Sequence, residues 1–112
     1  MFRIETVIRP EKFEAVKQAL NAIGVIAMTV DEVLGCGHQG GHAEYYRGME
    51  VQTSLLPKIR ITTVVHEVPV EQVIAAICSA AHTGEHGDGK IFIMPLMDAV
   101  RVRDRMRGPD AV

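Results

Sequence analysis

Apolar residues recur along the chain at two spacings, and each spacing predicts a different kind of element. Residues 2–10 alternate apolar and polar side chains, which predicts a strand. Apolar positions three and four residues apart follow, which predicts an amphipathic helix that starts near Pro10 and ends at Gly24. The same reasoning predicts strands over 25–35, 58–67 and 90–97, a short further strand over 99–103, and a second helix over 70–81.

The order of these elements is β-α-β-β-α-β, which predicts an α+β ferredoxin-like sandwich formed by a single domain over 1–112. In such a fold the helices cover one face of the sheet. The predicted strands 25–35 and 90–97 are apolar on both faces, so the second face also needs a cover. Another copy of the chain is the simplest cover, and we therefore expect a homo-oligomer.

A segment of about twenty residues, 37–57, joins the second and third predicted strands, where two to six residues are usual. It has little apolar periodicity and begins in the stretch GCGHQGGHAEYYRG, residues 35–48. Connections of this length are functional or disordered. Tyr45 and Tyr46 are expected to contact a partner or to pack at the base of the loop.

Composition and charge narrow the class of protein. The hydrophobic fraction is 47%, the charged fraction 23% and the net charge −2, which gives no general attraction to nucleic acid or to membranes. Two cysteines, Cys36 and Cys78, are too few for a disulfide framework and favour a reducing cytoplasm. The first residues lack the apolar run of a signal peptide, and no stretch is long enough for a membrane span.

A second glycine cluster, TGEHGDGKIF at 83–92, has the spacing G-x-x-x-x-G-K. It is not a Walker motif, because Ile91 replaces the magnesium-binding Ser or Thr and the cluster runs from helix to strand. Glycine N–H groups followed by Lys90 can still bind an anion. Arg101 and Arg103 alternate on the predicted strand 99–103 and could grip phosphates from one side. A glycine-rich turn with two solvated arginines remains the alternative.

The sequence supports a metal site and a catalytic site less strongly than it supports an anion-binding site. Strong zinc sites have four ligands in paired spacings. The candidates here are three on one loop and two at the second glycine cluster, one of them just before it: Cys36, His38, His42, His82 and His86. Neither Ser54 nor Ser79 has a histidine with an orienting carboxylate nearby in sequence. Asp31 and Glu32 alternate across a strand. We therefore expect no enzyme.

Together these residues resemble the PII nitrogen-regulatory signal-transduction family over nearly the whole chain. The resemblance is carried by TGEHGDGKIFI (83–93), MTVDEVLGCG (28–37), GHAEYYRG (41–48), LPK (56–58) and the two arginines at 101 and 103. It implies a ferredoxin-like homotrimer that binds ATP or ADP between subunits, with Mg and 2-oxoglutarate as further ligands. The long loop would dock on a protein target such as an ammonium channel, a nitrogen-assimilation enzyme or a regulator.

The resemblance also implies roles for individual residues. The nucleotide-binding set would be Thr29, Gly35, Gly37, His38, Val64, Gly87, Asp88, Gly89, Lys90, Arg101 and Arg103. The 2-oxoglutarate set would be Gln39, Gly41, Lys58 and Gly87, with Gln39 also a ligand of Mg. The implied segments are a target-binding loop over about 37–57, a phosphate-binding loop over about 82–90 and a C-terminal segment over 101–112.

The chain departs from the family pattern at several positions. Val51 replaces the tyrosine that some members uridylylate, and valine has no hydroxyl to modify. His38 stands where an arginine commonly contacts phosphate, so we expect nucleotide affinity that is weaker and pH-dependent near the imidazole pKa of about 6.5. The other departures are Cys36 for an aromatic residue, Gly40 for a lysine, Thr62 for a glutamate and Glu85 for a lysine.

Two alternative functions remain beside the nucleotide sensor. A PII-like sensor of another ligand, a metal or bicarbonate, in a different pathway is favoured by the altered positions 36, 38, 40 and 51. A weak nucleotide-hydrolysing enzyme is opposed by the absence of a recognisable base and of the Walker serine.

Overall fold

The computed structural model describes residues 1–37, 43–46, 49–52 and 55–112. Its four-stranded sheet is antiparallel throughout and has the strand order β2-β5-β1-β6. These strands are β1 (Phe2–Ile8), β2 (Thr29–Gly35), β5 (Leu56–Val65) and β6 (Gly89–Pro95), and the helices are α1 (Phe13–Ala22) and α2 (Val70–Ala81). Short 3-10 helices span Pro10–Lys12 and Gly108–Ala111. The predicted ferredoxin-like α+β architecture is confirmed.

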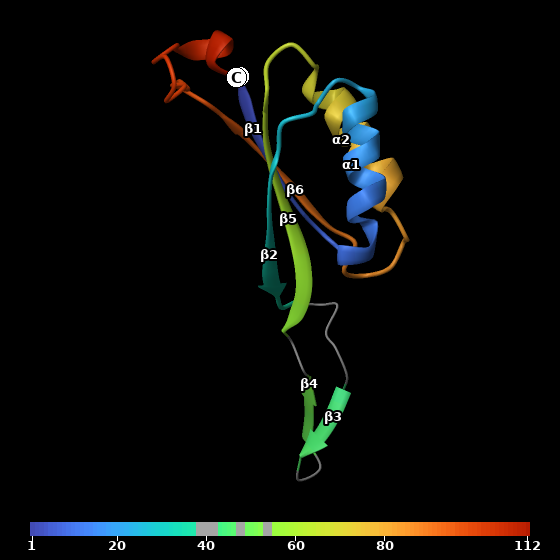
Figure 1. Ribbon diagram of the computed structural model, residues 1–112. Helices are drawn as coiled ribbons and strands as arrows, with labels where there is room; N and C mark the ends of the chain where they lie inside the picture. The colour runs from blue at the N-terminus through green and yellow to red at the C-terminus, as the bar shows by residue number, and fades with distance from the viewer. Residues whose placement is uncertain (38–42, 47–48, 53–54) are drawn as a thin grey trace.

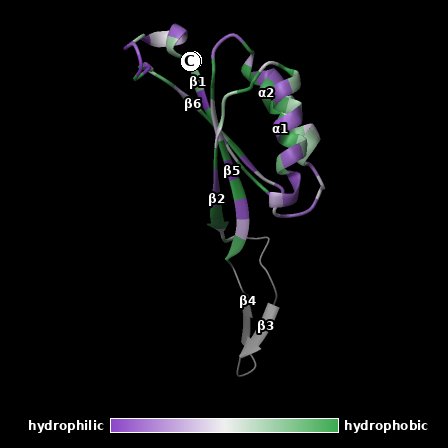
Figure 2. Cartoon of the chain, in the orientation of Figure 1, coloured by the Kyte–Doolittle hydropathy of each residue, from purple (hydrophilic) through white to green (hydrophobic). Residues whose placement is uncertain are grey.

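Both helices pack on one face of the sheet, as Figure 1 shows. The core lies between these two layers because each helix turns one apolar stripe inward and alternate strand residues face it. In Figure 2 the helices accordingly carry both hydrophobic and hydrophilic positions. The core residues are Ile4, Ile8, Val16, Leu20, Val25, Ile61, Val65, Val73, Ile77 and Ala81. Within the described ranges, neither helix has the length and apolar character that a bilayer span requires.

The second strand starts later than the apolar pattern predicts. Gly24 adopts a φ of +92°, and the next residue, Val25, donates its N–H to the carbonyl of Leu20 at 2.9 Å. This turn closes α1 and directs Val25 into the core, where it is 5% exposed. The predicted strand 25–35 is therefore wrong over its first four residues, which approach the sheet before pairing begins at Thr29.

The sheet face opposite the helices is more polar than expected. Glu5 alternates with the buried Ile4 on β1 and therefore points to this open face. There Arg60 makes a two-point contact with Asp31, at 3.1 and 2.6 Å, and lies 3.5 Å from Glu5. This cluster, with the Arg3 and Lys90 positions beside it, makes the uncovered face partly polar. By strand alternation, the apolar residues on the same face are Val7, Val33, Val64, Phe92 and Met94. The expectation of an apolar face therefore holds for β6 and fails on β2, where Thr29 and Asp31 lie on this face.

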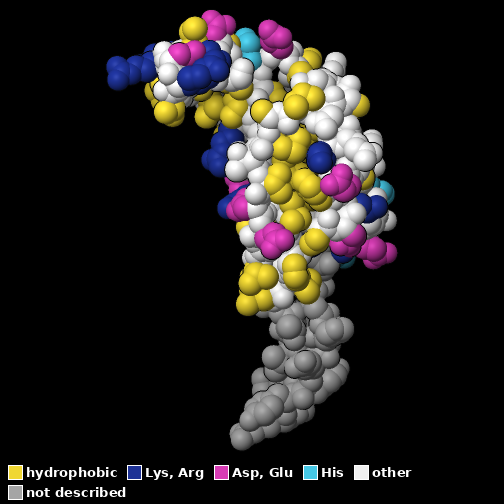
Figure 3. Space-filling view, in the orientation of Figure 1, with side chains coloured by type: hydrophobic (Ala, Val, Ile, Leu, Met, Phe, Trp, Pro, Cys, Tyr) yellow, Lys and Arg dark blue, Asp and Glu magenta, His cyan; other side chains and the backbone are white. Residues whose placement is uncertain are grey.

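Apolar side chains are exposed at both edges of the sheet and on the segment that follows β6. At the β2 edge, Ile26, Val30 and Leu34 are 67%, 40% and 66% exposed. On β6, Phe92 and Ile93 are 48% and 41% exposed, and beyond the strand Met97 and Val102 are almost fully exposed. Figure 3 shows hydrophobic side chains at the surface in the middle of the domain and beside the C-terminal segment. The expected homo-oligomer stays a prediction, and the apolar surface that needs a cover lies at both sheet edges and on the C-terminal segment.

A two-stranded antiparallel hairpin lies within the segment 37–57, which the sequence predicts as a long loop. Its strands are β3 (Ala43–Tyr46) and β4 (Met49–Gln52), paired from Ala43 with Gln52 to Tyr46 with Met49. Tyr45 and Tyr46 are in the first strand, and Val51 is in the second. The sequence-predicted residues His38, Gln39, Gly40, Gly41, His42 and Ser54 lie outside the described residues.

The predicted strand 99–103 is wrong. Only Val100 forms an isolated bridge, with Arg107, and a turn occupies the residues between them. Arg105 has a φ of +61° and donates its N–H to the Arg101 carbonyl at 2.8 Å. Valines alternating with arginines imitate a strand in sequence, but ion pairs within the segment favour a closed turn instead.

Candidate functional site

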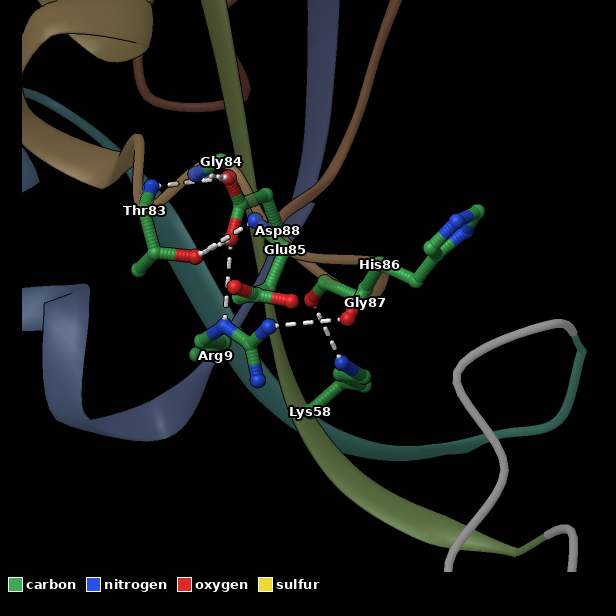
Figure 4. A network of polar contacts seen from close by, with 8 residues as sticks. All are labelled: Arg9, Lys58, Thr83, Gly84, Glu85, His86, Gly87 and Asp88. Carbon is green, nitrogen blue, oxygen red and sulfur yellow. Dashed lines mark hydrogen bonds and ion pairs between the residues drawn. The ribbon is translucent and has the colours of Figure 1, made fainter.

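Asp88 organises the loop that joins α2 to β6. Its carboxylate accepts hydrogen bonds from the Thr83 N–H at 2.7 Å, from the Gly84 N–H at 2.9 Å and from the Thr83 hydroxyl. Figure 4 shows these donors converging on the one carboxylate. Gly84 and Gly87 have φ of +93° and +100°, which suits glycine because it lacks the Cβ that disfavours this region. The loop is thus closed around Asp88 by its own backbone.

Arg9, just beyond the end of β1, fixes this loop to the sheet. Its Nε donates to the Asp88 carboxylate at 3.2 Å, and its NH2 group donates to the His86 carbonyl at 2.9 Å. The Thr83 hydroxyl, the Thr83 and Gly84 N–H groups and Arg9 all stabilise the charged form, so the pKa of Asp88 lies far below its ordinary value. Asp88 is therefore a structural anion, and its carboxylate is already satisfied within the loop.

Lys58 connects the same loop to the start of β5. The side chain is 9% exposed, and its Nζ donates to the Gly87 carbonyl at 2.8 Å. Burial is the main cause that lowers the pKa of Lys58, and the positive charge of Arg9 adds to it. Gly35, at the end of β2, leaves room for this side chain, because a Cβ there would lie 3.3 Å from the Lys58 Cγ. Gly35, Lys58 and Gly87 are thereby brought to one place.

Gly89 and Lys90 begin β6 at the same end of the sheet. A Cβ on Gly89 would lie 1.8 Å from the Val7 carbonyl oxygen, and its φ is +114°, so the position requires glycine. Lys90 pairs with Val7, which places it on the open face. Its side chain is exposed, and within the described part of the chain it makes no hydrogen bond or ion pair. Lys90 is a cation available to a ligand.

Thr29 and Val64 lie away from this end. Val64 is level with Arg3 on β1, whereas Gly89 is level with Ile8, so the two positions are separated by about 17 Å along the strands. Thr29 is on the opposite edge strand, β2, roughly 14 Å across the sheet from β6. Neither residue meets the 82–90 loop within one chain.

Arg101 and Arg103 lie beyond the far end of β6. Arg101 binds Asp104 through Nε at 3.0 Å and through NH2 at 2.8 Å, and Arg103 lies 3.7 Å from the same carboxylate. The hydrogen bond with Arg101 is the main cause that lowers the pKa of Asp104 and raises that of Arg101. The two arginines therefore share a turn and a carboxylate, and they do not project from one strand face as predicted.

The sequence-predicted residues thus fall into two separate groups. Gly35, Lys58 and Gly87–Lys90 gather near the start of β6, while Arg101 and Arg103 follow its other end, about 20 Å away along the strand. Figure 1 shows the C-terminal segment at the end of β6 remote from the 82–88 loop. A single chain does not bring both groups to one ligand.

Three residues that the sequence reasoning missed hold these groups in place: Arg9, Thr83 and Asp104. Thr83 lies five residues before Asp88 in a glycine-rich turn, a spacing at which side chains commonly bond nearby backbone. Asp104 lies three residues after Arg101 and was also visible as a local partner. No signal marks Arg9, because 79 residues separate it from Asp88.

The described residues include no group of three His, Cys, Asp or Glu placed to hold a metal ion. Cys36 and Cys78 are free and exposed. Of the residues implied for 2-oxoglutarate and Mg, Lys58 and Gly87 are in contact, and Gln39 and Gly41 lie outside the described ranges. A buried lysine beside open glycine backbone is chemically suited to a carboxylate ligand.

Comparison with known proteins places the chain among related sequences. A family model described as Nitrogen regulatory protein P-II matches residues 1–106. The chain is 46% identical over the full length of both chains to a protein of that name from Azospirillum brasilense. It is 40% identical to a nitrogen regulatory PII-like protein from Bacillus subtilis, covering all of this chain and 97% of the other.

Solved structures agree with the sequence comparisons. B. subtilis GlnK matches with a TM-score of 0.81 and 40% identity, covering 99% of this chain and 97% of GlnK. The complex of B. subtilis GlnK with ATP matches with a TM-score of 0.82 and 34% identity, covering 99% of this chain and 94% of the other.

Proposed function

The chain belongs to the nitrogen regulatory protein P-II family, and we propose that it is a signal transducer that binds ATP or ADP. The observation that carries the proposal is the likeness of nearly the whole chain to a relative in complex with ATP. The loop over 82–88 adds support, because it is rigidly closed, requires glycine at its end and leads directly into the exposed Lys90. Such backbone and charge suit a polyphosphate.

We infer that the nucleotide site forms between copies of the chain in a homotrimer. Gly87–Lys90 and Arg101 lie at opposite ends of β6 in one protomer, so only a second protomer can supply the arginine to the first. The exposed apolar side chains Phe92 and Ile93 lie along the same edge strand and would be covered by the neighbour. Thr29 and Val64 would line the adenine and would come from the same protomer as the arginines.

Within this site Asp88 acts differently from its neighbours. Its carboxylate is occupied by Thr83, Gly84 and Arg9 and would repel phosphate, so its contribution to the ligand is its backbone N–H. Gly87, Gly89 and the Lys90 ammonium would complete the cradle, and the resemblance to the family adds Gly35, Gly37 and His38 to the proposed site. The Arg101 and Arg103 guanidinium groups of the second copy would supply the remaining positive charge that binds the phosphates.

We infer that Lys58 couples the phosphate loop to the long loop. Gly35 and Lys58 lie at the two ends of the 37–57 segment, and Lys58 also bonds the Gly87 carbonyl. A ligand at Gly87 that accepts from Lys58 Nζ would therefore shift the end of the long loop. Binding alters the loop only if the ligand prefers one of its conformations.

2-Oxoglutarate with Mg is the effector we propose for this coupling. Lys58 would exchange its bond to Gly87 for the effector carboxylate, with Gln39 and Gly41 completing the site and Gln39 bound to Mg. The long loop would then engage a target protein in the cytoplasm, such as an ammonium channel, a nitrogen-metabolism enzyme or a regulator. The function requires no catalysis, and Val51 has no hydroxyl to be uridylylated.

Calorimetry on mixed oligomers tests the shared site. Lys90→Gln and Arg101→Gln are each expected to weaken ATP binding at least tenfold as pure oligomers, since each removes a charge-assisted bond. When differently tagged copies are co-expressed and mixed trimers are purified, one cleft per trimer pairs an intact Lys90 with an intact Arg101. Mixed trimers should therefore recover about one high-affinity site each.

The controls make the outcome unambiguous. Lys17→Gln removes a lysine from α1 whose contact is with Glu14, and it should bind ATP as the parent chain does. Sedimentation should give three times the chain mass of 12.3 kDa. Binding that stays absent in mixed trimers would place the whole site within one protomer, and a parent chain indifferent to ATP and ADP would end the proposal.

A further inference from the structure

The Arg101 guanidinium is already occupied by an anion of the same chain. Asp104 accepts from Arg101 Nε at 3.0 Å and from its NH2 group at 2.8 Å, the two-point geometry that a phosphate would also use. We propose that Asp104 is an internal competitor of the nucleotide phosphates for Arg101 and so sets the affinity of the site. This inference rests on the proposed function, because it assumes that Arg101 meets the phosphates.

The fold holds Asp104 in this position. The Arg101 N–H donates to the Met106 carbonyl at 2.9 Å, and the Gly108 N–H donates to the Ala99 carbonyl at 2.9 Å. The turn is therefore closed by antiparallel backbone bonds around the bridge of Val100 with Arg107. Asp104 is further fixed because its Oδ1 accepts from the Met106 N–H at 3.1 Å.

A second closure lies at the base of the turn. Arg107 bonds Asp98 through both Nε, at 2.8 Å, and its NH2 group. The other oxygen of Asp98 accepts from the Gly108 N–H at 3.1 Å. Asp98 thus neutralises Arg107 and closes the base of the turn. Asp104, at its tip, faces Arg101 and Arg103.

Two effects make Asp104 oppose phosphate binding. A phosphate that binds the Arg101 guanidinium at two points must displace the Asp104 carboxylate. Because the ion pair is exposed, breaking it weakens ATP binding by only a small factor. The displaced carboxylate then stays near the phosphate oxygens and repels them, including those held by Arg103, which is 3.7 Å away. The combined effect should be roughly five- to tenfold in the dissociation constant for ATP.

Asp104→Asn tests the inference and preserves the turn, because the Asn oxygen can still accept from the Met106 N–H. Glu71→Gln is the matched control: it makes the same charge change at an exposed carboxylate on α2 that forms no hydrogen bond or ion pair among the described residues. Asp110 is unsuitable as a control, because Arg101 donates to its carbonyl at 3.3 Å and its negative charge acts on Arg101. Calorimetry with ATP should give tighter binding by roughly five- to tenfold for Asp104→Asn and a change of less than about twofold for Glu71→Gln. Adenosine, followed by ligand-detected NMR, should bind both variants as it binds the parent chain.

A double-variant cycle shows whether Asp104 acts through Arg101. In an Arg101→Gln background, the gain in ATP affinity from Asp104→Asn should fall to about twofold or less, because the guanidinium for which Asp104 and phosphate compete is absent. Equal ATP affinities of Asp104→Asn and Glu71→Gln, weaker binding by Asp104→Asn, or an undiminished gain without Arg101 would each overturn the inference while leaving nucleotide binding intact. Loss of ATP binding by every variant and by the parent chain would instead overturn the proposed function, and the inference with it.

Discussion

Lys58 donates a hydrogen bond from its buried Nζ to the carbonyl oxygen of Gly87 at 2.8 Å. This contact joins the strand that follows the long loop to the turn that precedes β6. A buried ammonium needs such a partner, since its desolvation is otherwise uncompensated. The contact therefore fixes the relative positions of two segments that are 29 residues apart.

Replacing Lys58 by Met should loosen the 82–88 loop with little change in global stability. Methionine fills a similar volume and removes the desolvation cost, so the free energy of unfolding should change by less than about 1.5 kcal/mol. The Gly87 carbonyl loses its donor, and amide exchange in residues 84–88 should accelerate. Hydrogen exchange with mass spectrometry measures this, and Lys17→Met on α1 should leave the exchange of these amides unchanged.

Gly89→Ala should destabilise the chain strongly. The new Cβ would lie 1.8 Å from the Val7 carbonyl oxygen in a strand pairing that cannot shift locally, and φ is +114°. We expect a loss of at least about 3 kcal/mol in thermal or urea unfolding. Gly37→Ala has open space within 4 Å and is the matched control, with an expected change within about 0.5 kcal/mol. Similar unfolding curves for the two variants would contradict the tight packing at Gly89.

Asp88 should make the stability of the chain sensitive to acid. The pKa of Asp88 in the folded state lies far below its unfolded value of about 3.9. Ionised Asp88 therefore contributes fully to the free energy of unfolding above the unfolded pKa, and this contribution is lost as the pH falls toward the folded pKa. Thermal midpoints of the parent chain should therefore decrease between about pH 4 and pH 2.

Asp88→Asn provides the comparison for this acid response. Asparagine cannot titrate, so its midpoint should decrease less steeply over the same range, although it should start lower at neutral pH because the bond to Arg9 loses its charge. Glu71→Gln should retain the slope of the parent chain, since the exposed Glu71 side chain forms no hydrogen bond or ion pair among the described residues. Equal slopes for the parent chain and Asp88→Asn would contradict the role of Asp88.

His38 should make nucleotide affinity dependent on pH. An imidazole beside phosphates attracts them only when it is protonated, so ATP should bind more tightly at pH 6 than at pH 8, around the reference pKa of about 6.5. His38→Arg should bind more tightly at both values and lose this dependence, because a guanidinium stays charged. Calorimetry at the two pH values measures both effects, and equal affinities throughout would remove His38 from the site.

Local pattern was sufficient where an element is formed by neighbours in sequence. The second helix was predicted over 70–81, the observed bounds of α2, because its stripe of Val73 and Ile77 and the preceding Pro69 are local signals. Local pattern failed at 25–28 and at 99–103. In both places alternating apolar residues imitate a strand, but pairing in a sheet depends on partners distant in sequence.

The sequence by itself determined the layers of this protein, the phosphate-loop glycines and the lysine that follows them, because spacing and residue type are properties of a single short stretch. Only the tertiary structure decided that Arg9 holds Asp88, that Lys58 reaches Gly87, and that β6 separates Lys90 from Arg101. The physical reason is that these relationships depend on how separate strands are placed side by side, and contacts between residues far apart in the chain leave no mark on the local pattern of either partner.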